Sequence, residues 1–277
     1  MTIAALPIPT CILTPHGIEP TPYVATSFTD AASHDPLGVY TIGRTYQRDH
    51  VLLFDDHLER LEQSAALEGI TITVDRPALR NALRSLIEQG GYPDSRYKIT
   101  VPTDPPQRLI LAVEPFKPVA AEIIANGARV VTVHRARPNP AAKTSAWAQA
   151  RQSTVQSFPA GIYEGILVND AGDLLEGTSC NFYAVIGGTL RTAMQGVLEG
   201  ISRRTLLKVA ADILPLDPRP ANVSDTLDEA FLTSAGRGLV PIVEIDGKAV
   251  GAGKPGPYTL RLREAYERFA LANMEKI

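Results

Sequence analysis

The sequence has few of the features that mark secreted, membrane-spanning or nucleic-acid-binding proteins. Only two of its 277 residues are cysteines, Cys11 and Cys180, so it encodes no disulfide framework and both thiols are expected to be reduced; a single bridge between them is the alternative. No apolar run approaches the roughly 20 residues needed to cross a bilayer. The formal net charge of -3 removes any electrostatic argument for nucleic acid or an anionic membrane as a partner.

Two further absences concern location and metal binding. Residues 1–13 contain no Lys or Arg and are interrupted by prolines, so no signal peptide is predicted and we expect a cytoplasmic protein. The five histidines show none of the spacings typical of metal ligands, so no metal site is expected. The apolar fraction is an ordinary 44%, and the chain is long enough for one large domain or two smaller ones.

The first part of the chain shows strand patterns and helix patterns in turn. Alternation of apolar and polar residues indicates strands, and apolar residues at helical spacing indicate two helices bounded by caps, glycines and a proline. The predicted elements are strands at 23–28, 37–46 and 51–54, helices from 55 or 56 to 69 and from 77 to 90, and strands at 97–101 and 108–113. This order predicts a small α+β domain over residues 1–116.

The second part of the chain is predicted to form a larger domain. Two prolines within Glu114–Pro118 indicate an interdomain linker, placed at 117–120, and the second domain then covers 121–277. Its predicted elements are strands at 129–134, 163–169 and 181–186, a hairpin turn at 187–188, a helix from about 201, a strand at 228–233 and a final helix at 258–275.

One lysine and one glutamate stand out in this second part. Glu176 lies at a predicted strand end after a D-A-G-D turn, and Gly177-Thr178-Ser179 follows as a small-residue loop whose backbone can approach a ligand. Lys143 precedes the glutamate by 33 residues and is the only lysine between Lys117 and Lys208. Taken alone, such a pair indicates nothing more than surface charge.

The residues around Glu176 carry more information. The segment EGTSCNF, residues 176–182, closely resembles the E-G-small-small-x-N-aromatic signature of the class IV, fold-type IV pyridoxal-phosphate aminotransferases. That family includes branched-chain and D-amino acid aminotransferases and aminodeoxychorismate lyases. The resemblance implies a two-domain, mixed α+β and α/β fold of the D-amino acid aminotransferase type. It also implies pyridoxal 5'-phosphate as cofactor, with Lys143 as the catalytic lysine and Glu176 and Asn181 as cofactor-binding residues. Glu176 would face the ring nitrogen, because a nearby carboxylate favours the charged pyridinium.

Three further segments resemble the phosphate-binding elements of that family. HLERLEQSA resembles its H-x-x-R-L helix, so Arg60 is expected to reach the phosphate; a solvated helix charge is the alternative. LEGISRR resembles its L-x-G-I/V-T/S-R motif, so the amides of Ile201 and Ser202 at a helix start are expected to bind the phosphate; an ordinary capped helix is the alternative. FLTSAG resembles a family turn whose backbone amides bind the phosphate or the substrate carboxylate. Ser234 and Ala235 are therefore expected to contribute to cofactor binding.

The substrate side is less clearly defined. GVYTIGRTY resembles a family strand and implies that Tyr40 faces the substrate, with a core tyrosine as the alternative. Gly236 is expected near the substrate carboxylate. The sequence departs from the family in having no tyrosine shortly after Lys143 and no arginine after the strand near position 100. Arg237 and Arg44 are the candidate replacements for that arginine, although both could be surface charges. A register shift of one residue would place the Arg44 side chain on the opposite face of its strand.

The segment after the lysine also differs from the branched-chain pattern. Trp147 and Arg151 follow Lys143 at intervals of four residues, a spacing that would place them on one helical face beside it. This departure indicates a branch of the family that differs from the branched-chain enzymes.

The predicted function is transamination. The protein would move an amino group between an amino acid or primary amine and a 2-keto acid through a Schiff base on Lys143. Two alternatives remain open: a lyase of the aminodeoxychorismate type, and a degenerate member that binds the cofactor without turnover. The resemblance further implies a homodimer, with the active site near the domain interface and a contribution from the neighbouring chain. Small-molecule amino donors and keto-acid acceptors are the expected partners, and neither nucleic acid nor a membrane is.

Overall fold

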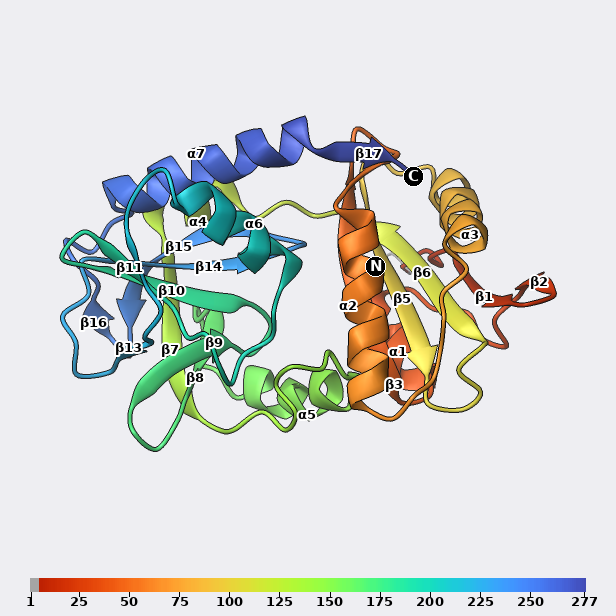
Figure 1. The fold of residues 1–277 in the computed structure, drawn as a ribbon, viewed down its shortest axis with the longest axis horizontal. Coiled ribbons are helices and arrows are strands. Elements are labelled where there is room, and N and C mark those ends of the chain that lie inside the picture. The colour runs from red at the N-terminus through yellow and green to blue at the C-terminus, as the bar shows by residue number, and fades with distance from the viewer. Residues whose placement is uncertain (1–4) are drawn as a thin grey trace. The chain divides into compact units, whose positions relative to one another are not determined.

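The computed structural model describes residues 5–277, which divide into two units (Figure 1). The first unit comprises the described residues up to Lys117 together with Ala142–Ala146 and Asn273–Ile277. The second unit comprises Pro118–Ala141 and Trp147–Ala272. The two short segments of the first unit lie within the range that the sequence assigned to the second domain.

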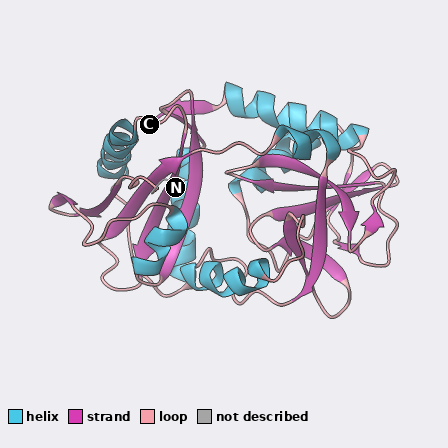
Figure 2. Cartoon of the chain, turned by 180° about the vertical axis from the view of Figure 1, so that it is seen from behind, coloured by secondary structure: helices cyan, strands magenta, loops and turns pink. Residues whose placement is uncertain are grey.

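The described residues of the first unit form a sheet in which every pairing is antiparallel. Figure 2 shows the strands of the chain in magenta. The strands of this sheet are β1 (Thr10–Thr14), β2 (Gly17–Glu19), β3 (Gly38–Tyr46), β4 (His50–Leu52), β5 (Ser95–Pro102), β6 (Leu109–Pro115) and β17 (Met274–Lys276), in the order β17-β4-β3-β5-β6-β1-β2. The predicted hairpin of β3 and β4 and the predicted strands β5 and β6 are confirmed. The final helix was predicted too long, because it ends at Ala272 and β17 then pairs with β4.

Three helices accompany this sheet: α1 (Phe28–His34), α2 (Phe54–Leu67) and α3 (Arg76–Gly90). The Asp75 carboxylate caps α3 by accepting the Ala78 N–H at 2.9 Å, and Gly91 ends it with φ of 61°. A strand over residues 23–28 was a wrong prediction. The Ser27 side chain instead accepts the Asp30 N–H and begins α1.

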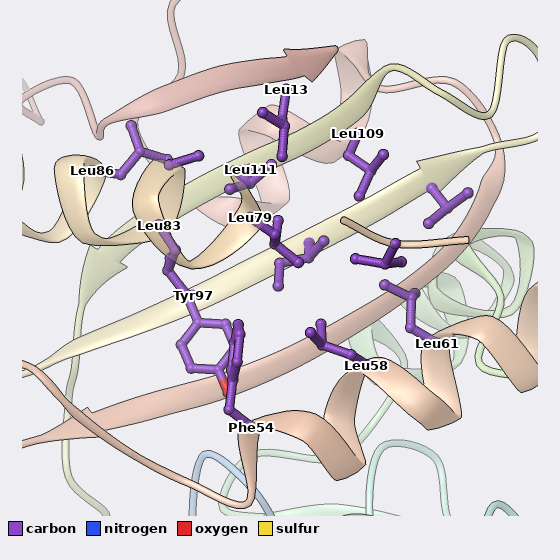
Figure 3. Close-up of a cluster of buried hydrophobic side chains, with 14 of the residues drawn as sticks. Leu13, Phe54, Leu58, Leu61, Leu79, Leu83, Leu86, Tyr97, Leu109 and Leu111 are labelled. Atoms are coloured by element: carbon purple, nitrogen blue, oxygen red, sulfur yellow. The ribbon is translucent and has the colours of Figure 1, made fainter. Parts of the chain in front are cut away.

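Strand β6 shows how the core of the first unit is divided between the two faces of its sheet. Leu109, Leu111 and Val113 belong to the cluster formed with α2 and α3, whereas Ala112 belongs to a smaller cluster with α1. Figure 3 shows the larger cluster, which contains Leu58 and other leucines from the helices beside the sheet residues. Each such fully buried side chain stabilises the fold by roughly 1.5–3 kcal/mol relative to an exposed one.

The second unit is built on a larger mixed sheet. Its strands are β7 (Ala128–His134), β8 (Glu164–Val168), β9 (Asp173–Gly177), β10 (Asn181–Ile186), β11 (Thr189–Arg191), β12 (Leu216–Asp217), β13 (Ala221–Asn222), β14 (Glu229–Ser234), β15 (Gly238–Ile245) and β16 (Lys248–Ala249). The order β10-β14-β15-β7-β8-β9 closes on itself, because β9 also pairs with β10 where Glu176 faces Asn181. The result is a closed barrel, which leaves those strands no free edge along this path.

The helices of this part of the chain are α4 (Ala121–Asn126), α5 (Ser145–Gln156), α6 (Ile201–Ala210) and α7 (Pro257–Ala272). Alternation along β10 separates two clusters: Phe182 and Ala184 pack with the other barrel strands, whereas Tyr183 and Val185 pack with α6 and α7. Among residues 5–277, the search for a helix long and apolar enough to cross a membrane finds none.

Candidate active site

Lys143 is held in the first unit by backbone hydrogen bonds to two of its elements. The Tyr40 N–H in β3 donates to the Lys143 carbonyl at 2.9 Å, and the Lys143 N–H donates to Ser64 Oγ in α2 at 3.2 Å. A bridge between Val39 and Thr144 continues this pairing. Lys143 Nζ lies 4.8 Å from the centroid of the Tyr40 ring, a cation–π distance. The structure therefore brings the predicted catalytic lysine and the predicted substrate-side tyrosine together.

Lys143 itself is not helical. Helix α5 begins at Ser145, so the predicted arrangement of Lys143, Trp147 and Arg151 along one helical face is wrong in including the lysine. The side chain of Ser145, the first residue of α5, bonds to β3: its Oγ accepts the Gly38 N–H at 2.8 Å and donates to the Gly38 carbonyl at 3.0 Å. These bonds tie the end of the Lys143 segment to the start of β3.

Arg60 is buried rather than solvated. Its side chain lies inside the first unit with 5% of its surface exposed, and Nη2 donates to Thr41 Oγ1 at 2.8 Å. The same hydroxyl lies 2.8 Å from His57 Nδ1, one helical turn earlier in α2. A solvated helix charge is therefore excluded for Arg60. A buried guanidinium held by fixed neighbours is suited to binding an anionic group such as a phosphate.

Arg44 lies on the same face of β3 as Tyr40, since the two are four residues apart on a strand. Its guanidinium lies between two aromatic rings, 4.1 Å from the centroid of Tyr46 and 4.4 Å from that of Phe116. Arg44 thus shares the Tyr40 face of β3 and is fixed by stacking on aromatic rings, whereas its role toward a substrate stays a prediction.

Glu176 is the acidic centre of the second unit. Only 2% of its surface is exposed, and its two oxygens accept different donors. Oε1 accepts Nη1 of Arg137 at 3.0 Å, and Oε2 accepts the Leu198 N–H at 3.0 Å and Asn181 Nδ2 at 3.5 Å. The strand end predicted for Glu176 is confirmed, because β9 ends at Gly177. The carboxylate is thereby oriented by groups from three separate segments.

Asn181 connects this carboxylate to the start of α6. Its Nδ2 also donates to the Leu198 carbonyl at 2.8 Å, and a Cβ at Gly200 would lie 2.4 Å from Asn181 Oδ1. Gly200 is the N-cap of α6, so the close approach requires glycine at the cap. Ile201 and Ser202 then form the first turn, where the backbone N–H groups lack intrahelical acceptors and favour an anion.

The turn between β14 and β15 contains Ser234, Ala235, Gly236 and Arg237. The Arg237 N–H donates to the Ser234 carbonyl at 3.1 Å, and Ser234 pairs with Gly238 across the turn. The turn therefore presents its backbone amides from a fixed hairpin. Such amides are suited to binding a phosphate or carboxylate oxygen.

The Arg237 side chain is engaged within the second unit. Nη1 donates to Glu164 Oε2 at 3.1 Å, Nη2 donates to Ser179 Oγ at 2.7 Å, and Nε donates to Ser234 Oγ at 3.0 Å. Burial alone would raise the pKa of Glu164, but Arg237 and the hydroxyls of Ser179 and Thr178 outweigh it and hold that pKa below its ordinary value. This network links the turn to the loop after Glu176.

Two charged residues of the second unit were missed from the sequence: Arg137, which contacts Glu176, and Glu164, which contacts Arg237. Arg137 lies in the irregular stretch R-P-N-P, where no periodicity indicates the direction of a side chain. Glu164 is a carboxylate at the start of the apolar strand β8, and a buried carboxylate of this kind requires a partner, which is the one signal that could have identified it.

Comparison with known proteins identifies the family. The profile described as amino-transferase class IV matches residues 38–245. The chain belongs to the class IV aminotransferases. Members of this family depend in general on pyridoxal phosphate, and the prediction of an aminotransferase is confirmed.

Curated relatives carry the same activity in their names. The D-alanine aminotransferase of Bacillus licheniformis is 25% identical over 266 residues, which cover 86% of this chain and 89% of that protein. The branched-chain-amino-acid aminotransferase of Escherichia coli K12 is 27% identical over 235 residues, which cover 76% of each.

Solved structures confirm the predicted fold. The crystal structure of the branched-chain aminotransferase from the thermophilic archaeon Thermoproteus uzoniensis with norvaline superposes with a TM-score of 0.77 at 23% identity, covering 98% of this chain and 99% of that chain. At this identity the likeness establishes the fold of this class IV aminotransferase and not its substrate.

Proposed function

We propose that this class IV aminotransferase uses pyridoxal 5'-phosphate, attached through Lys143, to move an amino group between an amino acid or primary amine and a 2-keto acid. The observation that carries the proposal is the position of Asn181. Its amide contacts the Glu176 carboxylate, and its Oδ1 faces the Gly200 cap of α6. The carboxylate proposed for the ring nitrogen and the amides proposed for the phosphate are therefore joined within one unit.

The chemical character of the residues fits this cofactor. Pyridoxal phosphate has an aldehyde, a ring nitrogen and a phosphate, and when bound it supplies an aldehyde that takes up amino groups and a ring that accepts electrons. Lys143 supplies the amine, and Glu176 supplies an acceptor-only carboxylate for the ring N–H. The phosphate would be held by the amides of Ile201 and Ser202, with the Ser234–Ala235 turn and Arg60 as further donors.

Each proposed site residue has a separate role in the reaction. Once the donor's amino group has displaced it, Lys143 Nζ would remove the proton from the donor α-carbon as a general base and deliver it, as a general acid, to the carbon that takes over the amino group; with the 2-keto acid the same transfer would run in reverse. Tyr40 limits the directions in which Nζ can move, since the ammonium lies over its ring. Glu176 keeps a proton at the ring nitrogen, because an anion beside it favours the charged form. Asn181 holds the Glu176 carboxylate in place.

Residues on the substrate side are proposed as Tyr40, Gly236, Arg237 and Arg44. Tyr40 supplies an aromatic surface, and Gly236 supplies a backbone amide from a turn without a side chain to obstruct a ligand. The hydrogen bonds of Arg237 to Glu164 and Ser179 favour a positioning role for this side chain. We further propose a homodimer, as the family resemblance implies, and a cytoplasmic location, as expected from the sequence.

The test is the visible absorbance of the purified protein before and after adding amino donors. Because the relatives are named for branched-chain amino acids and for D-alanine, the panel contains L-leucine, L-valine, D-alanine and a primary amine. We expect a cofactor band that one donor removes and a 2-keto acid restores. Lys143→Ala should lose the band, whereas the exposed Lys117→Ala should keep it.

The outcomes separate the alternatives. A donor that is consumed while the band persists would favour the lyase, because an elimination leaves the cofactor in its aldehyde form. A band that no donor changes would favour a member without turnover. Wild-type protein that binds no pyridoxal phosphate after reconstitution would contradict the proposal.

A further inference from the structure

A guanidinium that belongs to none of the family-like motifs contacts the carboxylate proposed for the ring nitrogen. Arg137 Nη1 donates to Glu176 Oε1 at 3.0 Å. Both side chains are almost fully buried, with 7% of Arg137 and 3% of Glu176 exposed. A charged contact at this depth is screened very little by salt or water, so each partner strongly affects the other.

Trp147 holds Arg137 in this place. The indole ring centroid lies 5.8 Å from the Arg137 guanidinium, within cation–π range. The indole Nε1 donates to the Thr178 carbonyl at 3.1 Å, two residues after Glu176. The tryptophan thus joins the loop that carries Arg137 to the loop that follows Glu176.

The contact with Arg137 complements the other contacts of the carboxylate. Oε2 accepts the Leu198 N–H and Asn181 Nδ2, so Arg137 and these groups hold opposite ends of Glu176 and fix its plane. A nearby cation also favours the ionised carboxylate over the protonated one. The Cys180 thiol interacts with Glu176 as well, but burial raises its pKa and it stays protonated and neutral.

We propose that Arg137 is a positioning residue that keeps Glu176 ionised and oriented toward the ring nitrogen of the bound cofactor. The assignment rests on the proposed function of Glu176. Arg137 does not itself touch substrate or cofactor in this proposal, since it acts through the carboxylate. Its removal would leave a buried carboxylate that takes up a proton or turns away, and a neutral Glu176 would no longer favour a protonated ring.

The chain offers a matched control two residues away. Arg135 also lies over the Trp147 ring, at 5.3 Å, but it donates to the Ala150 carbonyl and to Thr154 Oγ1 rather than to Glu176. Arg135→Met and Arg137→Met therefore each remove a guanidinium that contacts the Trp147 ring. Only the second removes a contact with the carboxylate.

The experiment measures the affinity of the apoprotein for pyridoxal phosphate by absorbance titration, together with the band shape of the bound form and kcat. Arg137→Met is expected to weaken binding about tenfold or more, to change the band toward that of Glu176→Gln, and to lower kcat. Arg137→Lys retains the charge and should bind within about threefold of wild type. Arg135→Met should be within about twofold.

A double-mutant cycle separates positioning from packing. In the Glu176→Gln background, Arg137→Met should change the affinity by less than about twofold, because the group through which Arg137 acts is absent. An equal loss in both backgrounds, or Arg137→Met that binds like wild type, would overturn the assignment.

The remaining outcomes are also decisive. If Arg137→Met gives no folded protein by circular dichroism, Arg137→Lys carries the test, and a tenfold loss in that variant overturns the proposal. Wild-type protein that binds no cofactor would overturn the proposed function itself. If the wild-type protein binds pyridoxal phosphate and Arg137→Met binds it with the same affinity, only the role of Arg137 would be overturned.

Discussion

Arg237 donates to the buried Glu164 carboxylate at 3.1 Å and thereby joins the β14–β15 turn to the strand that begins at Glu164. The carboxylate also accepts the Ser179 hydroxyl at 2.6 Å. Removing one partner of such a pair leaves the other charge buried and uncompensated. The pair is therefore expected to stabilise the second unit and to fix the turn proposed as an anion site.

Arg237→Met should lower the free energy of unfolding by about 3 kcal/mol, the usual result of breaking a buried ion pair. Urea unfolding followed by circular dichroism measures it. The exposed Arg219, which pairs with Asp217, is the control. An exposed guanidinium contributes little to stability, so Arg219→Met should have a much smaller effect than Arg237→Met. Similar losses for both variants would contradict the role given to the buried pair.

The same pair predicts a pH dependence of stability. The pKa of Glu164 is lowered in the folded protein, so its contribution is fully present above the ordinary glutamate value of about 4.3 and is lost as the pH falls through the folded pKa. Glu164→Gln should reduce the slope of stability against pH below about 4.3 and leave it unchanged between pH 6 and 8. An unchanged slope at acid pH would show that this group does not titrate as predicted.

Gly200 should not tolerate even alanine. A Cβ there would lie 2.4 Å from Asn181 Oδ1, so Gly200→Ala forces Asn181 away from the Leu198 carbonyl and from Glu176. We expect a stability loss of about 1–3 kcal/mol and about tenfold weaker cofactor binding. Thermal unfolding and absorbance titration measure the two effects.

The double variant that combines Gly200→Ala with Asn181→Ala is the control for this prediction. With the amide removed, the added methyl group meets no oxygen, so Gly200→Ala should cost less in the Asn181→Ala background than in wild type. Additive losses would mean that the methyl group acts through another contact.

The single tryptophan gives a direct optical signal from the proposed site. Trp147 is the only tryptophan of the chain, and its Nε1 donates to the Thr178 carbonyl beside Glu176. Adding pyridoxal phosphate to the apoprotein should therefore change the intrinsic emission with the same midpoint as the absorbance titration. Trp147→Phe should lower stability by about 1–2 kcal/mol, because the carbonyl loses its donor. A change in emission at a different midpoint would place the cofactor elsewhere.

Both cysteines should resist alkylation in the folded protein. Burial raises the pKa of the Cys11 thiol to about 11 and that of Cys180 well above its ordinary value, and only a thiolate attacks an alkylating reagent. At pH 8 iodoacetamide should react with neither residue in hours, and with both in urea. Mass spectrometry counts the modified sites, and rapid labelling of native protein would contradict the buried positions.

The local elements of this protein follow from its sequence. The spacing of Leu58 and Leu61 predicts α2, Gly91 with its positive φ ends α3 where predicted, and the strand end at Glu176 is correct. These features depend on neighbours within a few residues, so periodicity, capping and turn chemistry determine them. Lys143 and Glu176 were identified by the motifs around them.

Only the tertiary structure decided which segments meet. The return of β17 to pair with β4, the closure of the barrel at Glu176 and Asn181, and the contact of Arg137 with Glu176 all join residues distant in sequence. No local pattern indicates the partner in such pairs, because the choice depends on the whole packed arrangement. The sequence by itself determined the elements and the chemistry available, and the folded chain determined which charges face one another, since a buried charge is stable only beside its partner.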